Sequence, residues 1–148
     1  MTRYGSTGAS AREDEGPGAA LFALARAWAA GVVVLLFTEY VQATVVYEHV
    51  ATAARMGTFG GRLLLVHLPN ALCVALAVWA AARIHRAPFR DSVPRHLTAA
   101  LAVPVAAQLL NMGLQWERLS VEGLLMSNAV LVLGCVAGCA ADRLQEDA

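Results

Sequence analysis

A long apolar run with a single carboxylate inside it constrains this chain more than any other feature. Residues 32–42 read Val-Val-Val-Leu-Leu-Phe-Thr-Glu-Tyr-Val-Gln, so Glu39 lies within the run. In a soluble protein a glutamate would lie on the water-facing side of such a helix, but here apolar residues surround the helix on every side. An ionisable group within a membrane-spanning helix is costly and usually marks a functional site. The run therefore predicts a transmembrane helix with a candidate functional carboxylate.

Three further apolar stretches have the same length. The four predicted helices cover residues 27–47, 62–82, 97–117 and 121–141. Each has about 20 residues, the length that crosses a hydrocarbon layer of about 30 Å. The chain is 58% hydrophobic and only 15% charged, which leaves too little polar surface for a soluble fold. These patterns predict an all-α, integral membrane, antiparallel four-helix transmembrane bundle of up-down-up-down topology.

The segments outside the apolar stretches complete the expected organisation. Residues 1–18 are rich in Gly and Ser and are expected to form a disordered tail without a signal peptide. The four-span domain then covers residues 19–144, and 145–148 form a short C-terminal tail. Eight arginines fall on the side of the two termini and three on the other side, which predicts that both termini are cytoplasmic. The abundance of alanine, with arginine as the sole basic residue, indicates a bacterial protein of the cell membrane.

Polar residues gather in one zone of these spans. Counted from the predicted exterior ends of the helices at 1.5 Å per residue, they lie about 8–13 Å deep, whereas the cytoplasmic half is nearly free of them. Pairs three residues apart in a helix share a face, as Glu39 and Gln42 do. We therefore expect an outward-facing polar pocket. Its predicted ligand-binding residues are Glu39, Gln42, His67, Asn70, Gln108, Asn111 and Asn128.

These side chains also have a structural interpretation. Asn, Gln and His often join membrane helices through hydrogen bonds worth about 0.6–2 kcal/mol each. A carboxylate is a costly choice for that purpose, since an amide would serve equally well. Glu39 therefore carries the strongest functional interpretation, and His67 is either its proton partner or a structural histidine.

The fourth span contains Gly134 and Gly138, a small-xxx-small motif that lets another helix approach closely. Packing against the first or third span is one interpretation. Contact with a second copy of the chain or with a larger membrane partner is the other. The lipid bilayer is the remaining expected partner.

No metal, cofactor or nucleic acid is expected. Cys73, Cys135 and Cys139 lie in apolar runs without Cys-x-x-Cys spacing, which is typical of buried small side chains. His49, His85 and His96 fall at interfaces or in loops and form no ligand pattern. The net charge is zero and no basic block is present, which argues against nucleic-acid binding.

The chain resembles the small multidrug-resistance transporters in three features. These are four short-looped spans, Glu39 in the first span, and the tract from Glu117-Arg-Leu-Ser to Gly138. The chain departs from that family by its N-terminal tail, its long second loop, its extra amides and the lack of an aromatic residue in the middle of the third span. The family's proton-exchange mechanism is therefore not transferred. Four-helix thiol–quinone oxidoreductases have the same number of spans, but their Cys-x-x-Cys pair is missing here.

Three functions remain open at this level. The preferred one is binding or transport of a small cation or a polar or amphipathic ligand, with Glu39 exchanging a proton. The second is a non-catalytic accessory subunit of a larger membrane complex. The third is a membrane-embedded acid–base enzyme acting on a lipid-like substrate, in which Glu39 and His67 would be the catalytic residues.

Overall fold

The computed structural model describes residues 17–85, 92–118 and 120–146, and all its regular elements are helical. Residues 1–16 and 147–148 of the expected tails lie outside the described part. In chain order the elements are α1 (Pro17–Val41), η1 (Gln42–Tyr47), α2 (Ala53–Met56), α3 (Phe59–Arg62), η2 (Leu63–His67), α4 (Leu68–Ile84), α5 (Val93–Leu114), η4 (Trp116–Arg118) and α6 (Val121–Glu146). The segments η1 and η2 are π-helical, and η4 is a short 3₁₀ helix.

Within the described residues, four continuous helical stretches are long and apolar enough to cross a membrane. Their outer surfaces are apolar: Leu36 and Phe37 on α1 are 66% and 65% exposed, and Leu133 on α6 is 64% exposed. Water would not tolerate so continuous an apolar surface, but lipid does. The predicted all-α four-helix membrane bundle is therefore confirmed.

The helix boundaries differ from the predicted ones mainly at one end of the bundle. The first helix begins at Pro17 rather than at residue 27, because Pro is well suited to a first helical position and an Ala- and Leu-rich stretch follows it. The second span continues to Ile84, the third covers Val93–Leu114, and the fourth extends to Glu146. We call the end where α1 begins and α6 ends the termini end, and the opposite end the distal end.

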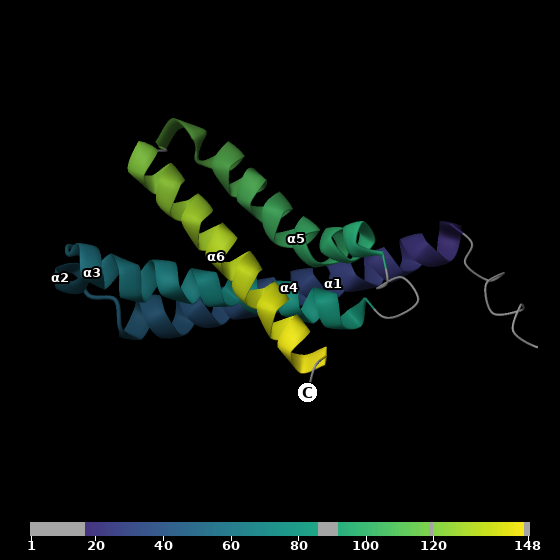
Figure 1. Ribbon diagram of the computed structural model, residues 1–148. Coiled ribbons are helices and arrows are strands. Elements are labelled where there is room, and N and C mark those ends of the chain that lie inside the picture. The colour runs from purple at the N-terminus through teal and green to yellow at the C-terminus, as the bar shows by residue number, and fades with distance from the viewer. Residues whose placement is uncertain (1–16, 86–91, 119, 147–148) are drawn as a thin grey trace, which may run out of the picture.

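Helix α4 is the centre of the bundle and packs against α1, α5 and α6 (Figure 1). Its closest contact is with α6, where a Cβ added at Gly138 would lie 2.6 Å from the carbonyl oxygen of Ala75. At Gly134 the added atom would lie 2.7 Å from Val74. The glycine motif therefore serves packing inside the chain. The expectation that it would meet the first or third span is wrong, because its partner is the second span.

The two ends of the bundle are closed to different degrees. At the termini end, side chains connect neighbouring helices: Arg26 donates to the carbonyl oxygen of Ile84 (3.2 Å), Trp28 to that of Thr98 (3.2 Å), and Trp79 to Oε1 of Gln145 (3.1 Å). Toward the distal end, the hairpin of α5 and α6 crosses the α1–α4 pair and points away from α2 and α3 (Figure 1). The helices are thus fastened at one end and diverge at the other.

Both π-helical segments lie in the distal half. In η2, the N–H of Leu68 donates to the carbonyl oxygen of Leu63, five residues earlier. Pro69 follows directly and has no N–H for the carbonyl of Leu65, which an α-helix would require at this point. The wider π-helical turn before Pro69 accommodates the absence of this backbone hydrogen bond. Single π-helical turns inside helices are frequently found at functional sites.

Candidate functional site

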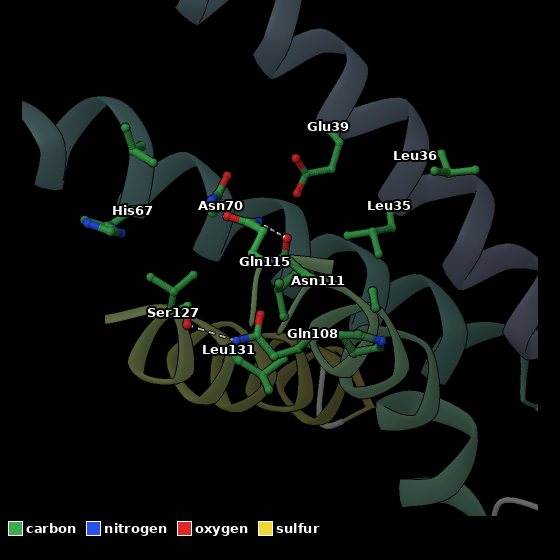
Figure 2. Close-up of a pocket in the computed structure, with 15 residues that line it drawn as sticks. Leu35, Leu36, Glu39, His67, Asn70, Gln108, Asn111, Gln115, Ser127 and Leu131 are labelled. Carbon is green, nitrogen blue, oxygen red and sulfur yellow. Dashed lines mark hydrogen bonds between the residues drawn. The ribbon is translucent and has the colours of Figure 1, made fainter. Parts of the chain in front are cut away.

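A cavity of about 490 Å³ lies in the distal half, where the α5–α6 hairpin diverges from α1 and α4. All four spans contribute to its wall (Figure 2). Its polar lining residues are Glu39, His67, Asn70, Gln108, Asn111, Gln115 and Ser127, and its apolar ones are Leu35, Leu36, Val66, Val74, Pro104, Ala107, Val130 and Leu131. The lining is thus partly polar and partly aliphatic.

Glu39 is the acidic group of this cavity. Its carboxylate points from α1 toward the side chains of Asn70 and Gln115 (Figure 2). Within the described residues it forms no hydrogen bond or salt bridge, and the cavity lining contains no arginine. Glu39 is also exposed, so a molecule that enters the cavity can reach its carboxylate. The carboxylate is therefore accessible and is not neutralised by a neighbouring cation of the described chain.

The amides of α5 occupy one helical face, as their spacing predicted. Gln108 donates from Nε2 to Oγ of Ser127 at 3.0 Å, which joins α5 to α6. Ser127 in turn donates to the carbonyl oxygen of Leu124 at 3.1 Å. Gln115 donates to Asn111 one turn away. These hydrogen bonds fix the orientation of the amides, as binding groups in a site require.

Two residues opposite α5 complete the polar side. Asn70, near the start of α4, forms no hydrogen bond within the described part of the chain and faces Glu39 (Figure 2). His67 ends η2 and lines both this cavity and a neighbouring one of about 350 Å³ toward the distal end. The wall of that neighbouring cavity also contains Arg62 and Glu122. His67 therefore lies between the main cavity and a charged region nearer the distal surface.

Two of the seven predicted ligand-binding residues lie elsewhere. Gln42 is 4% exposed; it donates to the hydroxyl of Tyr47 at 3.4 Å, and the thiol of Cys73 donates to its Oε1 at 3.5 Å. Gln42 follows directly on the last residue of α1 and begins η1, and its side chain binds Cys73 of α4 instead of lining the cavity. Asn128 donates to the carbonyl oxygen of Leu124 in its own helix at 2.8 Å and does not line the cavity.

Ser127 and Gln115, which are not among the seven predicted residues, line the cavity instead of Gln42 and Asn128. Gln115 continues the stripe of Gln108 and Asn111 by one turn, so its position follows from the sequence spacing. Ser127 was not anticipated, because a lone serine in an apolar helix carries little signal of its own. Its role as the hydrogen-bond acceptor of Gln108 is apparent only once α6 is packed beside α5.

The cysteines and the other candidate ligand groups form no metal centre in the described residues, where no three His, Cys, Asp or Glu side chains converge to hold an ion. Cys73, Cys135 and Cys139 are free thiols. The functional chemistry of the cavity accordingly depends on one carboxylate, one imidazole and several neutral amides and hydroxyls.

No protein-family model, curated protein or solved structure matches this chain. The likeness to small multidrug-resistance transporters therefore has no support from a matched family or fold. The geometry of the cavity is the basis for the function proposed below.

Proposed function

We propose that the protein binds a small organic cation beside Glu39 and carries it across the membrane in exchange for a proton. The observation that carries this proposal is the Glu39 carboxylate, which is accessible and has no ion-pair partner among the described residues, in a cavity whose lining contains no arginine. Two opposite charges about 4 Å apart attract each other by about 4 kcal/mol at an effective dielectric constant near 20. Exposure of Glu39 to the cavity opening reduces this attraction, although it does not change its sign.

The size and lining of the cavity favour an organic cation over a bare metal ion. A volume of about 490 Å³ lies within the range of about 300–1,000 Å³ that small-molecule sites have. Aliphatic side chains such as Leu35 and Leu131 would contact methyl or methylene groups. Asn70 and Asn111 offer carbonyl oxygens and N–H groups for the polar atoms of the ligand.

Coupling of cation transport to protons follows because Glu39 is the single acidic residue of the cavity lining. A carboxylate that carries a proton has no charge to attract a cation, so the cation and the proton compete for Glu39. Binding of one cation to the protonated site then releases one proton to water, and release of the cation allows reprotonation. His67 lines the same cavity and is the group that could accept that proton.

The unequal closure of the two ends supports a state that is accessible from one side. The termini end is fastened by the side chains of Arg26, Trp28 and Trp79, while the cavity lies in the diverging half. The distribution of arginines, eight against three, favours cytoplasmic termini. With that orientation the cavity faces the exterior, and transport requires the termini end to open in a second state.

The test uses the full-length protein in lipid nanodiscs with choline as the probe. Calorimetric titration should detect binding of choline but not of the neutral alcohol in which carbon replaces the choline nitrogen. Glu39→Gln should weaken choline binding by about ten-fold or more, which corresponds to the lower end of a charge-assisted interaction, ~1.5 kcal/mol. Glu48→Gln, which removes an exposed carboxylate near the end of the same span, is the matched control and should leave the affinity unchanged.

Equal affinities of the wild-type protein and the Glu39→Gln variant would refute the proposal. Equal binding of choline and the neutral alcohol would also refute it, because the charge of the ligand would then be irrelevant. Either result would favour the accessory-subunit role.

A further inference from the structure

Three ionisable side chains from three helices meet at the termini end, far along the bundle from the Glu39 cavity. His85 caps the end of α4, His96 lies in the first turn of α5, and Asp142 lies near the end of α6. His85 is 0% exposed and Asp142 is 1% exposed, and with Val78 they are the largest fully buried side chains of the described residues. Burial of ionisable groups is costly, and neutral amides would join the helices at lower cost.

The contacts order these residues into a chain with His96 in the middle. Nε2 of His96 lies 3.4 Å from Oδ2 of Asp142. The ring centroids of His85 and His96 are 5.8 Å apart, and the ring planes are tilted by 38°. The side chain of His96 is 21% exposed, whereas that of Asp142 is only 2% exposed. His96 is thus the member of the cluster that water can reach.

Small buried residues separate this cluster from the remainder of the bundle. Ala81 precedes His85 by one turn and Ala99 follows His96 by about one turn, and both are 0% exposed. Gly138, one turn before Asp142, is also buried and packs directly on α4. Protons therefore reach the cluster from the medium at the termini end, through the exposed edge of His96.

Each helix that packs there carries an arginine near the cluster. From α1, Arg26 donates to the carbonyl oxygen of Ile84, the neighbour of His85. In the sequence, Arg83, Arg95 and Arg143 lie within two residues of a cluster member. A protonated histidine among so many arginines requires a nearby anion, and the carboxylate of Asp142 supplies it.

We propose that His85, His96 and Asp142 form a proton-binding site that fastens α4, α5 and α6 together at the termini end. A proton from water binds to His96, whose Nε2–H then donates to the Asp142 carboxylate. When a proton returns to water from Nδ1, the neutral ring keeps its Nε2–H toward the carboxylate, so the hydrogen bond loses its charge assistance and the contact weakens. Histidine changes charge between about pH 5 and 8, so the site responds to ordinary changes in pH. This proposal is independent of the function proposed for Glu39.

The sign of the pH dependence follows from the contact. The ion pair exists only in the protonated form, so its contribution to stability is present at low pH and is lost as the pH rises. An interaction that only packs the helices would contribute equally at every pH. The slope of stability against pH therefore distinguishes a proton site from a structural contact.

The test combines nitrogen NMR of ¹⁵N-histidine-labelled protein in nanodiscs with thermal unfolding at a series of pH values. In the wild-type protein the His96 signal should change with pH, and the unfolding temperature should fall as the pH rises through that change. Asp142→Asn should remove this fall. His49→Gln is the matched control, because His49 is exposed, lies at the distal end and forms its hydrogen bond within its own segment, to the carbonyl oxygen of Thr44.

Three outcomes would overturn the proposal. One is a His96 signal that does not change with pH, which can be read from the wild-type protein even if Asp142→Asn fails to fold. Another is an Asp142→Asn variant with the same slope of unfolding temperature against pH as the wild type. The third is a His49→Gln variant that loses the slope, since the pH response would then arise at the distal end.

Discussion

Substitution of Gly138 by alanine should destabilise the bundle, because no space exists for a methyl group between α6 and α4. The added Cβ would lie 2.6 Å from the carbonyl oxygen of Ala75 and 2.7 Å from Cβ of Val78. Non-bonded atoms favour separations of about 3.5 Å or more, so the two helices would have to separate by about 1 Å. The carbonyl belongs to the backbone of α4, which leaves no flexible side chain to give way.

Two opposing effects determine the size of the change. Overpacking of this kind costs about 1–3 kcal/mol. Alanine is about 1 kcal/mol more favourable than glycine within a helix, which offsets part of that cost. We therefore expect a net loss of up to about 2 kcal/mol in the free energy of unfolding. Gly113→Ala is the matched control, because a Cβ at Gly113 in α5 meets no atom within 4 Å. It should instead stabilise the protein by up to about 1 kcal/mol.

The assay is reversible unfolding in mixed micelles of a mild detergent and dodecyl sulfate, followed by circular dichroism. The difference between the two variants should be about 1–3 kcal/mol, which is the cost of overpacking, because both variants gain the same helix propensity. Equal stabilities of Gly138→Ala and Gly113→Ala would refute the close packing of α4 on α6. A Gly138→Ala variant of unchanged stability that loses only self-association would assign the glycine to an interface between copies of the chain.

Two further substitutions test individual hydrogen bonds. Ser127→Ala removes the hydrogen-bond acceptor of Gln108. In the same micelle assay it should lower the free energy of unfolding by about 0.6 kcal/mol, with an upper limit of about 1.7 kcal/mol. A loss above that limit would mean that Ser127 has additional contacts. Gln42→Leu leaves the Cys73 thiol and the Tyr47 hydroxyl without their partner and should destabilise the protein by about 1–3 kcal/mol. The affinity for choline should remain unchanged in Gln42→Leu, and a large loss would place Gln42 in the ligand site after all.

The sequence was sufficient to predict the number and type of helices, because the length of an apolar run is set directly by the thickness of the hydrocarbon layer. It also placed Gln108, Asn111 and Gln115 on one face, since α5 follows regular α-helical spacing between Val93 and Leu114. Gln42 shows where this reasoning fails. Its spacing from Glu39 is that of one helix face, but its amide binds Tyr47 and Cys73 and does not line the cavity. Spacing predicts the face on which a residue lies, but not which neighbour its side chain binds.

The cluster at the termini end was missed for a related reason. The predicted helices ended at residue 82, began at 97 and ended at 141, which left His85, His96 and Asp142 just outside the spans. The actual helices extend to Ile84, from Val93 and to Glu146, so these side chains belong to the packed interior. Three ionisable residues at the same end of three consecutive spans were the available signal. Their convergence depends on helix packing angles, which periodicity does not encode.

The most direct test of the central claim, that Glu39 is the cation-binding group of an accessible cavity, is carbodiimide modification of the protein in its membrane. A hydrophobic carbodiimide reacts with a protonated carboxyl group in an apolar setting, and mass spectrometry of the peptides identifies the modified residue. Our account predicts that Glu39 is modified, that choline slows this modification in a concentration-dependent manner, and that the neutral isostere of choline does not. Modification of Glu39 at the same rate with and without choline would contradict it.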